Sequence, residues 1–358
     1  MTAGPTLARM RLPLLVLLAF AALGGLMAAI LLAGGYSPRT AAVALWSGSL
    51  GSWYSITSAT LVRAVPLMLA GCAVAVAFRG GVFNVGAEGQ LLVGAAAATA
   101  VALSIPGGGS IAIALALVAG GLAGCAWAAI AALLRSRFGV LEVISTIMLN
   151  FVALHGVSYL VRGPLQEPTR IYPQSSSIAD ALRLPRLPGA GRLHAGLLLA
   201  LVLLVVGGWA FRFTASGFRL RSVGENPSAA ASAGLIDVRS TTMKSFLASG
   251  ALAGLAGAIE VLGVTYALYD NISPGYGYTA IAVALIANLD PWRIIASATL
   301  FAALEAGASA MQRDANIPSS FVSIIEALLI LAAIAAQTLR RRSHSGASLA
   351  TDEALSPE

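Results

Sequence analysis

Residues 197–209 read Leu197-Leu198-Leu199-Ala200-Leu201-Val202-Leu203-Leu204-Val205-Val206-Gly207-Gly208-Trp209 and include no charged side chain. They belong to an apolar run, residues 193–212, of about the 20 residues that a helix needs to cross about 30 Å of hydrocarbon. Nine further runs of similar character lie along the chain, at residues 12–33, 57–78, 87–105, 110–134, 140–161, 245–266, 278–289, 292–311 and 318–339. The sequence therefore predicts an all-α, polytopic transmembrane helical bundle with about ten spans.

The amino-acid composition fits a protein embedded in a lipid bilayer. Of the 358 residues, only 10% are charged and 58% are hydrophobic, and the mean hydropathy is +0.85. Soluble domains carry about 25% charged residues, so a soluble globular fold is excluded. We expect one integral membrane domain over residues 1–342 and a polar, disordered tail over residues 343–358. Small-residue pairs, Gly120 with Gly124 and Gly250 with Gly254, predict close helix packing.

The basic residues set the expected orientation. With the N-terminus in the cytoplasm, 14 of the 22 basic residues fall on the inner side, 7 on the outer side, and Arg63 lies within a span. An inner excess of Lys and Arg is the usual pattern, so both termini are predicted to be cytoplasmic. The loop 162–192 is an exception, because its five arginines lie outside. Its proline-rich composition predicts an ordered external cap.

A short polar segment between two spans has residues typical of both ends of a helix. It reads Gly224-Glu225-Asn226-Pro227-Ser228-Ala229-Ala230-Ala231-Ser232-Ala233-Gly234. Asn226 is a good N-cap, Pro227 suits the first helical position, and Gly234 can end the helix in the left-handed conformation. The predicted helix, residues 227–233, is roughly 10 Å long, too short to cross a bilayer. On the cytoplasmic side, its small-residue face fits a groove on another protein.

No motif for catalysis or for a cofactor is present. A Walker A loop requires Gly-Lys before Ser or Thr, whereas the sole lysine lies in Met243-Lys244-Ser245. His-Glu-x-x-His and Cys-x-x-Cys are missing, and the three histidines are scattered. We expect a protein that is not an enzyme, with no metal or cofactor of its own. Membrane orientation accounts for the net charge of +7, and no nucleic-acid partner is expected.

Polar side chains inside the apolar runs mark candidate functional positions. A charge at the centre of a membrane helix costs about 2.5–3.5 kcal/mol on insertion scales. The candidates are Arg63, Glu88, Glu142, Asn150, His155, Glu260, Glu305 and Glu326. Structural roles remain open for two of them. Glu142 lies near a helix start, where a carboxylate complements the helix dipole, and Glu326 could pair with a neighbouring span.

Residues 80–90 allow two interpretations. They read Gly80-Gly81-Val82-Phe83-Asn84-Val85-Gly86-Ala87-Glu88-Gly89-Gln90, and their four glycines argue against a regular helix throughout. The segment is either a cytoplasmic turn or a discontinuous helix whose N-terminal N–H groups point at a polar solute. Residues 273–278, Ser273-Pro274-Gly275-Tyr276-Gly277-Tyr278, present a similar choice on the outer side. Their tyrosines either stack on a flat solute or anchor the chain at the membrane interface.

Five stretches, in order between about residues 57 and 336, resemble the permease subunits of bacterial nucleoside ABC importers, within the ribose and branched-chain amino acid permease group. They are Phe83-Asn84-Val85-Gly86-Ala87-Glu88-Gly89-Gln90, Ile147-Met148-Leu149-Asn150-Phe151, Tyr159-Leu160-Val161-Arg162-Gly163-Pro164-Leu165, Gly250-Ala251-Leu252-Ala253-Gly254-Leu255-Ala256-Gly257-Ala258-Ile259-Glu260 and Ser273-Pro274-Gly275-Tyr276-Gly277. The resemblance implies a translocation pathway for a nucleoside or a related small polar solute across a bacterial cytoplasmic membrane.

The resemblance also assigns residues and partners. It implies that the short polar helix couples to a cytoplasmic ABC ATPase subunit, which binds ATP, through Gly224, Glu225, Asn226, Pro227, Ala229, Ala230 and Gly234. Our candidates for the substrate pathway are Asn84, Glu88, Gln90, Asn150, Glu260, Tyr276 and Tyr278. Further implied partners are a second permease chain, identical or related, and an extracytoplasmic solute-binding lipoprotein. That lipoprotein would dock on the loop 162–192, helped by Arg170, Arg183 and Arg186.

Three alternatives remain open from the sequence. The first is an ABC permease for a simple sugar such as a pentose, and an amino acid is a weaker choice of solute. The second is a proton-coupled secondary transporter that uses Glu88 or Glu260, which leaves the short cytoplasmic helix without a role. The third is a membrane scaffold or passive channel, against which the polar segment 80–90 argues. Transport driven by ATP separates the first from the other two.

Overall fold

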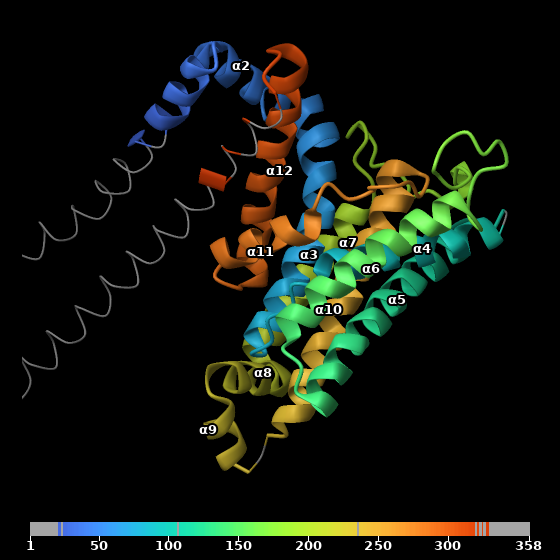
Figure 1. Ribbon diagram of the computed structural model, residues 1–358, viewed down its shortest axis with the longest axis vertical. Helices are drawn as coiled ribbons and strands as arrows, with labels where there is room; N and C mark the ends of the chain where they lie inside the picture. The colour runs from blue at the N-terminus through green and yellow to red at the C-terminus, as the bar shows by residue number, and fades with distance from the viewer. Residues whose placement is uncertain are drawn as a thin grey trace, which may run out of the picture. The chain divides into compact units, whose positions relative to one another are not determined.

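The computed structural model describes residues 21–22, 24–105, 107–234, 236–318, 321, 324 and 327–328. Within them the secondary structure is helical, with isolated β-bridges and no β-strand (Figure 1). The α-helices are α2 (Pro38–Ser49), α3 (Leu61–Arg79), α4 (Ala87–Ser104), α5 (Gly109–Phe138), α6 (Glu142–Arg162), α7 (Gly196–Phe213), α8 (Ala215–Glu225), α9 (Pro227–Ser232), α10 (Val238–Glu260), α11 (Tyr276–Ile286) and α12 (Pro291–Asp314). Two π-helical turns, η1 (Ser55–Thr60) and η3 (Val261–Thr265), adjoin α3 and α10, and η2 (Asp180–Leu182) is a 3-10 turn.

The predicted helical membrane bundle is confirmed. Seven described helices are long and apolar enough to cross a membrane, and α11 and residues 24–33 are shorter apolar helices. These nine match nine of the ten expected spans, with boundaries that shift by a few residues. The last expected span, 318–339, lies mostly outside the described residues, as do the start of the first span and the tail 343–358.

The chain divides into two compact units. The first comprises residues 1–51 and 304–358, and the second comprises residues 52–303. In the first unit, α2 begins at Pro38 with Ser37 as its N-cap. Side chains of both segments then form a small apolar core, made of Leu31, Ala41, Ala44, Met311 and Ile317. Hydropathy did not predict α2, because it is shorter than a span and only partly buried.

Glycines bring three central helices of the second unit into backbone contact. A Cβ on Gly94 of α4 would strike the backbone of Gly254 in α10, and a Cβ on Gly254 would strike the backbone of α5. Gly250 likewise packs against the Gly124 carbonyl. The predicted packing role of these glycines is confirmed, and we call this three-helix contact the glycine seam. It holds α4 at the centre of the unit.

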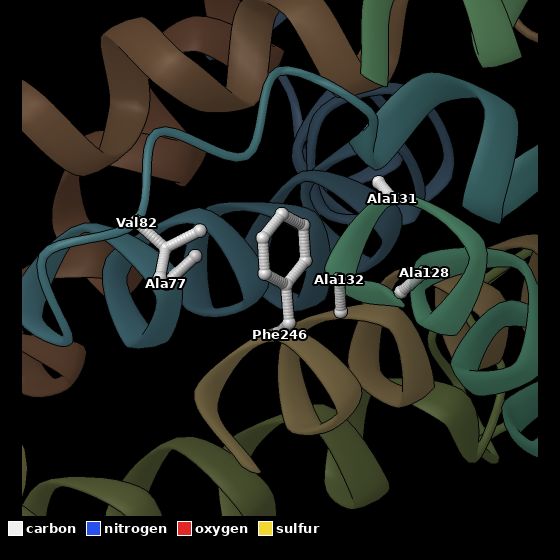
Figure 2. Close-up of a cluster of buried hydrophobic side chains, with 6 residues drawn as sticks. All are labelled: Ala77, Val82, Ala128, Ala131, Ala132 and Phe246. Atoms are coloured by element: carbon white, nitrogen blue, oxygen red, sulfur yellow. The ribbon is translucent and has the colours of Figure 1, made fainter. Parts of the chain in front are cut away.

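A buried cluster fixes the start of the connection between α3 and α4. The Phe246 ring of α10 lies between two groups, Ala77 with Val82 and the alanines of α5 (Figure 2). Phe246, Ala77 and Val82 are all fully buried. Because Val82 is held this way, the non-helical residues 80–86 have a defined path through the protein.

The loop between α6 and α7 is an ordered structure, as predicted for the external cap. Its backbone pairs with the chain that follows α10, where Ser175 donates to the Leu268 carbonyl at 2.7 Å. Leu184 N donates to the carbonyl of Leu262, within the π-helical turn η3, at 2.9 Å. The Arg183 guanidinium stacks on the Tyr266 ring, 4.4 Å from its centroid. The cap therefore fastens the outer end of α10.

Candidate functional site

Helices α4 and α11 begin at the same point in the protein. Gly277, in the first turn of α11, lies so close to the Ala87–Glu88 backbone of α4 that no Cβ fits there. From this meeting point α11 runs toward the inner end of α3, where Arg79 Nε donates to the Leu289 carbonyl at 3.2 Å. The two helices thus diverge from a shared origin, with both N-termini directed at it.

The contacts on either side place this origin between the two ends of the helix bundle. Before α11, Asp270 pairs with Arg162, the last residue of α6, at 2.7 Å. The chain between Asp270 and Tyr276 therefore passes, without α-helix, from the outer end of α6 to the origin. Residues 80–86 likewise pass, without α-helix, from the inner end of α3 to the shared origin. Of the two interpretations of residues 80–90, this arrangement favours the discontinuous helix.

Glu88 closes the N-terminus of α11. Its carboxylate accepts a hydrogen bond from Gly277 N at 2.6 Å, and its residue is only 7% exposed. The Ser273 hydroxyl accepts from Gly275 N and Tyr276 N, each at 3.1 Å, and also bonds to Glu88. A carboxylate at a helix N-terminus is stabilised by the helix dipole and the unpaired N–H groups there. Glu88 therefore joins α4 to α11.

Asn84 and Gln90 brace the connection before α4. Their side-chain amides exchange two hydrogen bonds of 3.1 Å, and Asn84 is fully buried. Asn84 Nδ2 also donates to Ser249 Oγ of α10 at 2.9 Å. Its Oδ1 accepts from Gly86 N at 2.9 Å. Every donor and acceptor of the Asn84 amide is thus used within the protein.

Asn150 of α6 completes the network from the opposite side. Its Oδ1 accepts from Gly89 N, an otherwise unpaired N–H in the first turn of α4, at 2.8 Å. Its Nδ2 donates to the Val85 carbonyl at 3.0 Å and to the Tyr278 hydroxyl at 3.3 Å. Asn150 acts as a cap for α4 supplied by another helix. We call the linked residues 84–90, Asn150, Ser249, Ser273, Gly277 and Tyr278 the polar junction.

The structure brings together most of the predicted pathway residues, although their surroundings differ. Tyr278 is 45% exposed, while the other six are buried. Tyr276 lies in the first turn of α11, beside the junction. Glu260 ends α10, and there its charge adds to burial in raising the pKa of Tyr269. Tyr278 is therefore the one exposed residue among these seven.

The short polar helix forms as predicted, with one residue fewer at its end. It is α9, Pro227–Ser232, and Asn226 Oδ1 accepts from Ala229 N at 3.0 Å as an N-cap. Gly234 has φ of +70°. Only Ala230 of the α9 residues is buried, so the helix presents its remaining surface outward (Figure 1).

The preceding helix α8 ties α9 to the membrane helices. Thr214 caps α8 by accepting from Gly217 N at 3.1 Å, and Leu220 and Val223 are buried. Gly224 lies against the Arg79 carbonyl so closely that no Cβ fits. Gly224 therefore belongs to the contact with α3, while Glu225 and Asn226 are exposed. We call α8 and α9 together the cytoplasmic arm.

Sequence reasoning missed several residues of these regions. Ser249, Ser273 and Gly277 complete the polar junction, and Arg79 holds the inner end of α11. Ser249 carries little signal in a single sequence, because a serine in a small-residue span is common. Ser273 offered a signal, since a serine hydroxyl in a Ser-Pro-Gly turn often accepts from the N–H groups two or three residues later.

Comparisons with known proteins agree with this architecture. The family model described as "Branched-chain amino acid transport system / permease component" matches residues 56–346. A guanosine ABC transporter permease protein of Bacillus subtilis is 38% identical over 93% of this chain and 95% of its own length. A glucose ABC transporter permease protein of Haloferax volcanii is 37% identical over 92% and 88%. A nucleoside ABC transporter permease protein of Lactococcus lactis is 32% identical over 85% of each chain.

No solved structure matches this chain. The family match covers α3 to α12, and therefore includes the polar junction, the external cap and the cytoplasmic arm. Discontinuous helices that meet within a multi-pass bundle are a feature of transporter folds. The chain belongs to the family of permease components of ABC transport systems typified by the branched-chain amino acid systems.

Proposed function

We propose that this permease forms the translocation pathway of an ATP-driven importer for nucleosides in a bacterial cytoplasmic membrane. The observation that supports the solute best is the naming of two relatives, similar over at least 85% of this chain, as guanosine and nucleoside permeases. The chain contributes no cofactor, and ATP is bound by a separate subunit. The pathway passes the polar junction, where the Tyr278 ring offers a flat aromatic surface for a nucleobase.

Uptake by the reconstituted importer tests this proposal. The permease, its ATPase and its partner permease are placed in proteoliposomes with the solute-binding protein outside and ATP inside, and labelled guanosine is supplied. We expect accumulation against a gradient, reduced by Tyr278→Ala and retained by Tyr278→Phe. Uptake that survives removal of ATP and collapses with the proton gradient contradicts the proposal and favours a proton-coupled carrier.

A simple sugar is the second candidate solute. The glucose permease relative from Haloferax volcanii is nearly as similar, at 37% identity, as the guanosine relative, at 38%. The same proteoliposomes distinguish the two solutes by competition, with unlabelled guanosine, glucose and ribose added separately. Inhibition by glucose or ribose but not by guanosine would assign the sugar.

The cytoplasmic arm supports a role for α9 in coupling to the ATPase. Its N-cap makes the helix rigid, and its outer surface consists of small side chains that fit a groove. We expect the double variant Glu225→Ala/Gly234→Leu to lose the ATPase subunit in a pull-down from mild detergent. Gly189→Leu is a matched control, since Gly189 also has positive φ (+71°) but lies in the external cap. Equal capture by both variants would contradict the coupling role.

The external cap is the proposed docking surface for the solute-binding lipoprotein. Arg183 is engaged within the cap by Asp180 and Tyr266. Among the described residues, Arg170 and Arg186 form no ion pair, so they are better placed to attract an acidic partner. We expect Arg170→Gln/Arg186→Gln to slow association a few-fold at low salt. Docking that is unchanged and insensitive to salt would overturn this assignment.

A further inference from the structure

A cavity of about 230 Å³ lies where the cytoplasmic arm meets the membrane helices. Its charged lining comes from four different elements: Arg79 at the end of α3, Arg212 at the end of α7, Arg221 on α8 and Asp290 in the turn before α12. The remaining lining is Gly208, Phe211 and Pro291. Three arginines therefore face one aspartate.

Among the residues that the structure describes, Arg212 is the arginine of this cavity that forms an ion pair. Arg212 Nη2 contacts Asp290 Oδ2 at 2.7 Å, and its guanidinium stacks on Trp292, 4.2 Å from the ring centroid. Burial alone would raise the pKa of Asp290. The hydrogen bonds from Arg212 and from Trp292 N, with the charges of Arg212 and Arg293, outweigh burial and lower it. Asp290 is thus ionised at neutral pH and forms its ion pair with Arg212.

Arg79 and Arg221 have no ion-pair partner of their own among the described residues. Arg79 donates to the carbonyls of Leu289 and Asn288, at 3.2 and 3.1 Å. No carboxylate within the described ranges forms an ion pair with Arg79 or Arg221. Asp290 and Glu225 act on Arg79 only from a distance, and Glu225 does not line the cavity. Two like charges facing one cavity repel each other, and an anion between them removes that repulsion.

The chemistry of the cavity selects the class of anion. Guanidinium groups bind phosphate oxygens with paired, charge-assisted hydrogen bonds. The cavity lies where α3 and α7 end. With the cytoplasmic N-terminus expected from the sequence, these ends face the cytoplasmic leaflet, where basic pockets bind anionic headgroups. We propose that Arg79, Arg212 and Arg221 form a binding site for a phosphate group, carried by an anionic phospholipid or by a soluble phosphate compound.

Such a ligand would affect the cytoplasmic arm. Arg221 belongs to α8, whereas Arg79 and Arg212 belong to the membrane helices, so a bound phosphate bridges the arm to the bundle. Arg221, the residue of the arm in this bridge, lies within two helical turns of α9 along the chain. Occupancy therefore stiffens the connection between α9 and the ends of α3 and α7. The site does not depend on the transported solute.

Thermal stability of the purified full-length chain tests the site. The protein in neutral detergent is titrated with phosphatidylglycerol, with phosphatidylcholine, and with inorganic phosphate against chloride at equal ionic strength. We expect the melting temperature to rise with a phosphate-bearing anion and not with phosphatidylcholine or chloride. A rise with phosphatidylglycerol alone assigns a lipid headgroup, and a rise with inorganic phosphate assigns a soluble ligand. No rise with either overturns the proposal.

Two variants on the same helix localise the effect. Arg221→Gln is expected to need roughly tenfold more ligand for the same rise, since it loses a charge-assisted hydrogen bond. Arg219→Gln makes the same charge change but lies on a different cavity, beside Lys244, and is expected to match the wild type. Equal weakening in both variants overturns the site. If Arg221→Gln does not fold, Arg221→Lys and native mass spectrometry of lipid retained by the wild type give the same decision.

Discussion

An asparagine has different structural roles in the polar junction and in the cytoplasmic arm. In the junction, Asn84 is fully buried and its amide bonds to Gln90, Ser249 and Gly86. In the arm, Asn226 is exposed and its side chain accepts a single hydrogen bond, from Ala229 N. Asn84 holds together segments that are distant in sequence, while Asn226 shapes one local turn. The buried asparagine here joins distant segments, and the exposed one caps a helix that we propose binds a partner.

This contrast changes how the polar residues of the spans are interpreted. Asn84, Gln90 and Asn150 were candidates for solute contact because buried polar groups in a membrane are expensive. The structure gives each of them protein partners. The free-energy cost of burying these side chains is offset by the hydrogen bonds that fix α4 and α11 at their common origin. We therefore propose that solute contact is made by groups that the junction positions, above all Tyr278.

The largest expected effect comes from Asn84→Ala. The variant leaves Gln90, Ser249 and Gly86 N without their partner, and each unsatisfied buried group costs about 1–3 kcal/mol. We expect a loss of about 3 kcal/mol or more in the free energy of unfolding, measured by denaturant titration in detergent. Asn84→Asp is a useful companion, since it keeps the acceptor for Gly86 N. A change below about 0.5 kcal/mol for Asn84→Ala would show that the junction is not structural.

Glu88 tests whether charge or hydrogen bonding joins the two half-helices. Glu88→Ala removes the acceptor for Gly277 N and the negative charge, and we expect a loss of about 2 kcal/mol together with most of the uptake. Glu88→Gln keeps an acceptor but loses the charge at the helix N-terminus, for a loss of about 1 kcal/mol. Stability of Glu88→Gln equal to that of the wild type would exclude the charge as a contributor, and equal stability of the two variants would exclude the hydrogen bond.

Asn226→Ala is the variant of the cytoplasmic arm that corresponds to Asn84→Ala in the polar junction. Loss of an N-cap costs about 1 kcal/mol of local helix stability. Because α9 is mostly exposed, we expect less than that in global unfolding. Stimulation of the ATPase by the solute-loaded binding protein is expected to fall about tenfold, measured as phosphate release by the complete importer. A variant that is strongly destabilised yet fully coupled would reverse the comparison.

The smallest expected effect concerns pH and the turn next to the arm. The pKa of Asp290 is lowered in the folded state, so its contribution to stability is present above its unfolded pKa of about 3.9 and is lost as the pH falls through the lower, folded value. We expect the wild type to lose about 1 kcal/mol more than Asp290→Asn between about pH 5 and pH 2. Parallel melting curves over this range would contradict the ion pair with Arg212.

Hydropathy predicted the membrane helices because burial in lipid demands long apolar runs. It placed the start of α10 at residue 245, whereas the helix begins at Val238. The missed turn contains Ser240, Thr241 and Lys244, which are polar and lie outside the apolar run. Short helices such as α2 and α8 were not predicted for a similar reason, since their faces are only partly apolar.

The cytoplasmic helix could be predicted because its signals are local. Asn226, Pro227 and Gly234 determine its ends without help from distant residues. The polar junction could be located by its glycines, but its pairing could not be predicted. A single sequence does not show that Gly89 meets Asn150 or that Glu88 meets Gly277. Those contacts are set by the packing of α4, α6, α10 and α11.

The sequence distances within the polar junction have a consequence for biosynthesis. The partners of residues 84–90 are synthesised later: Asn150 follows Gly89 by 61 residues, Ser249 follows Asn84 by 165, and Gly277 follows Glu88 by 189. At about 5–20 residues per second, Glu88 waits roughly 10 to 40 s for Gly277 to leave the ribosome. The buried contacts at the start of α4 are therefore completed late, only after the ribosome has passed Gly277.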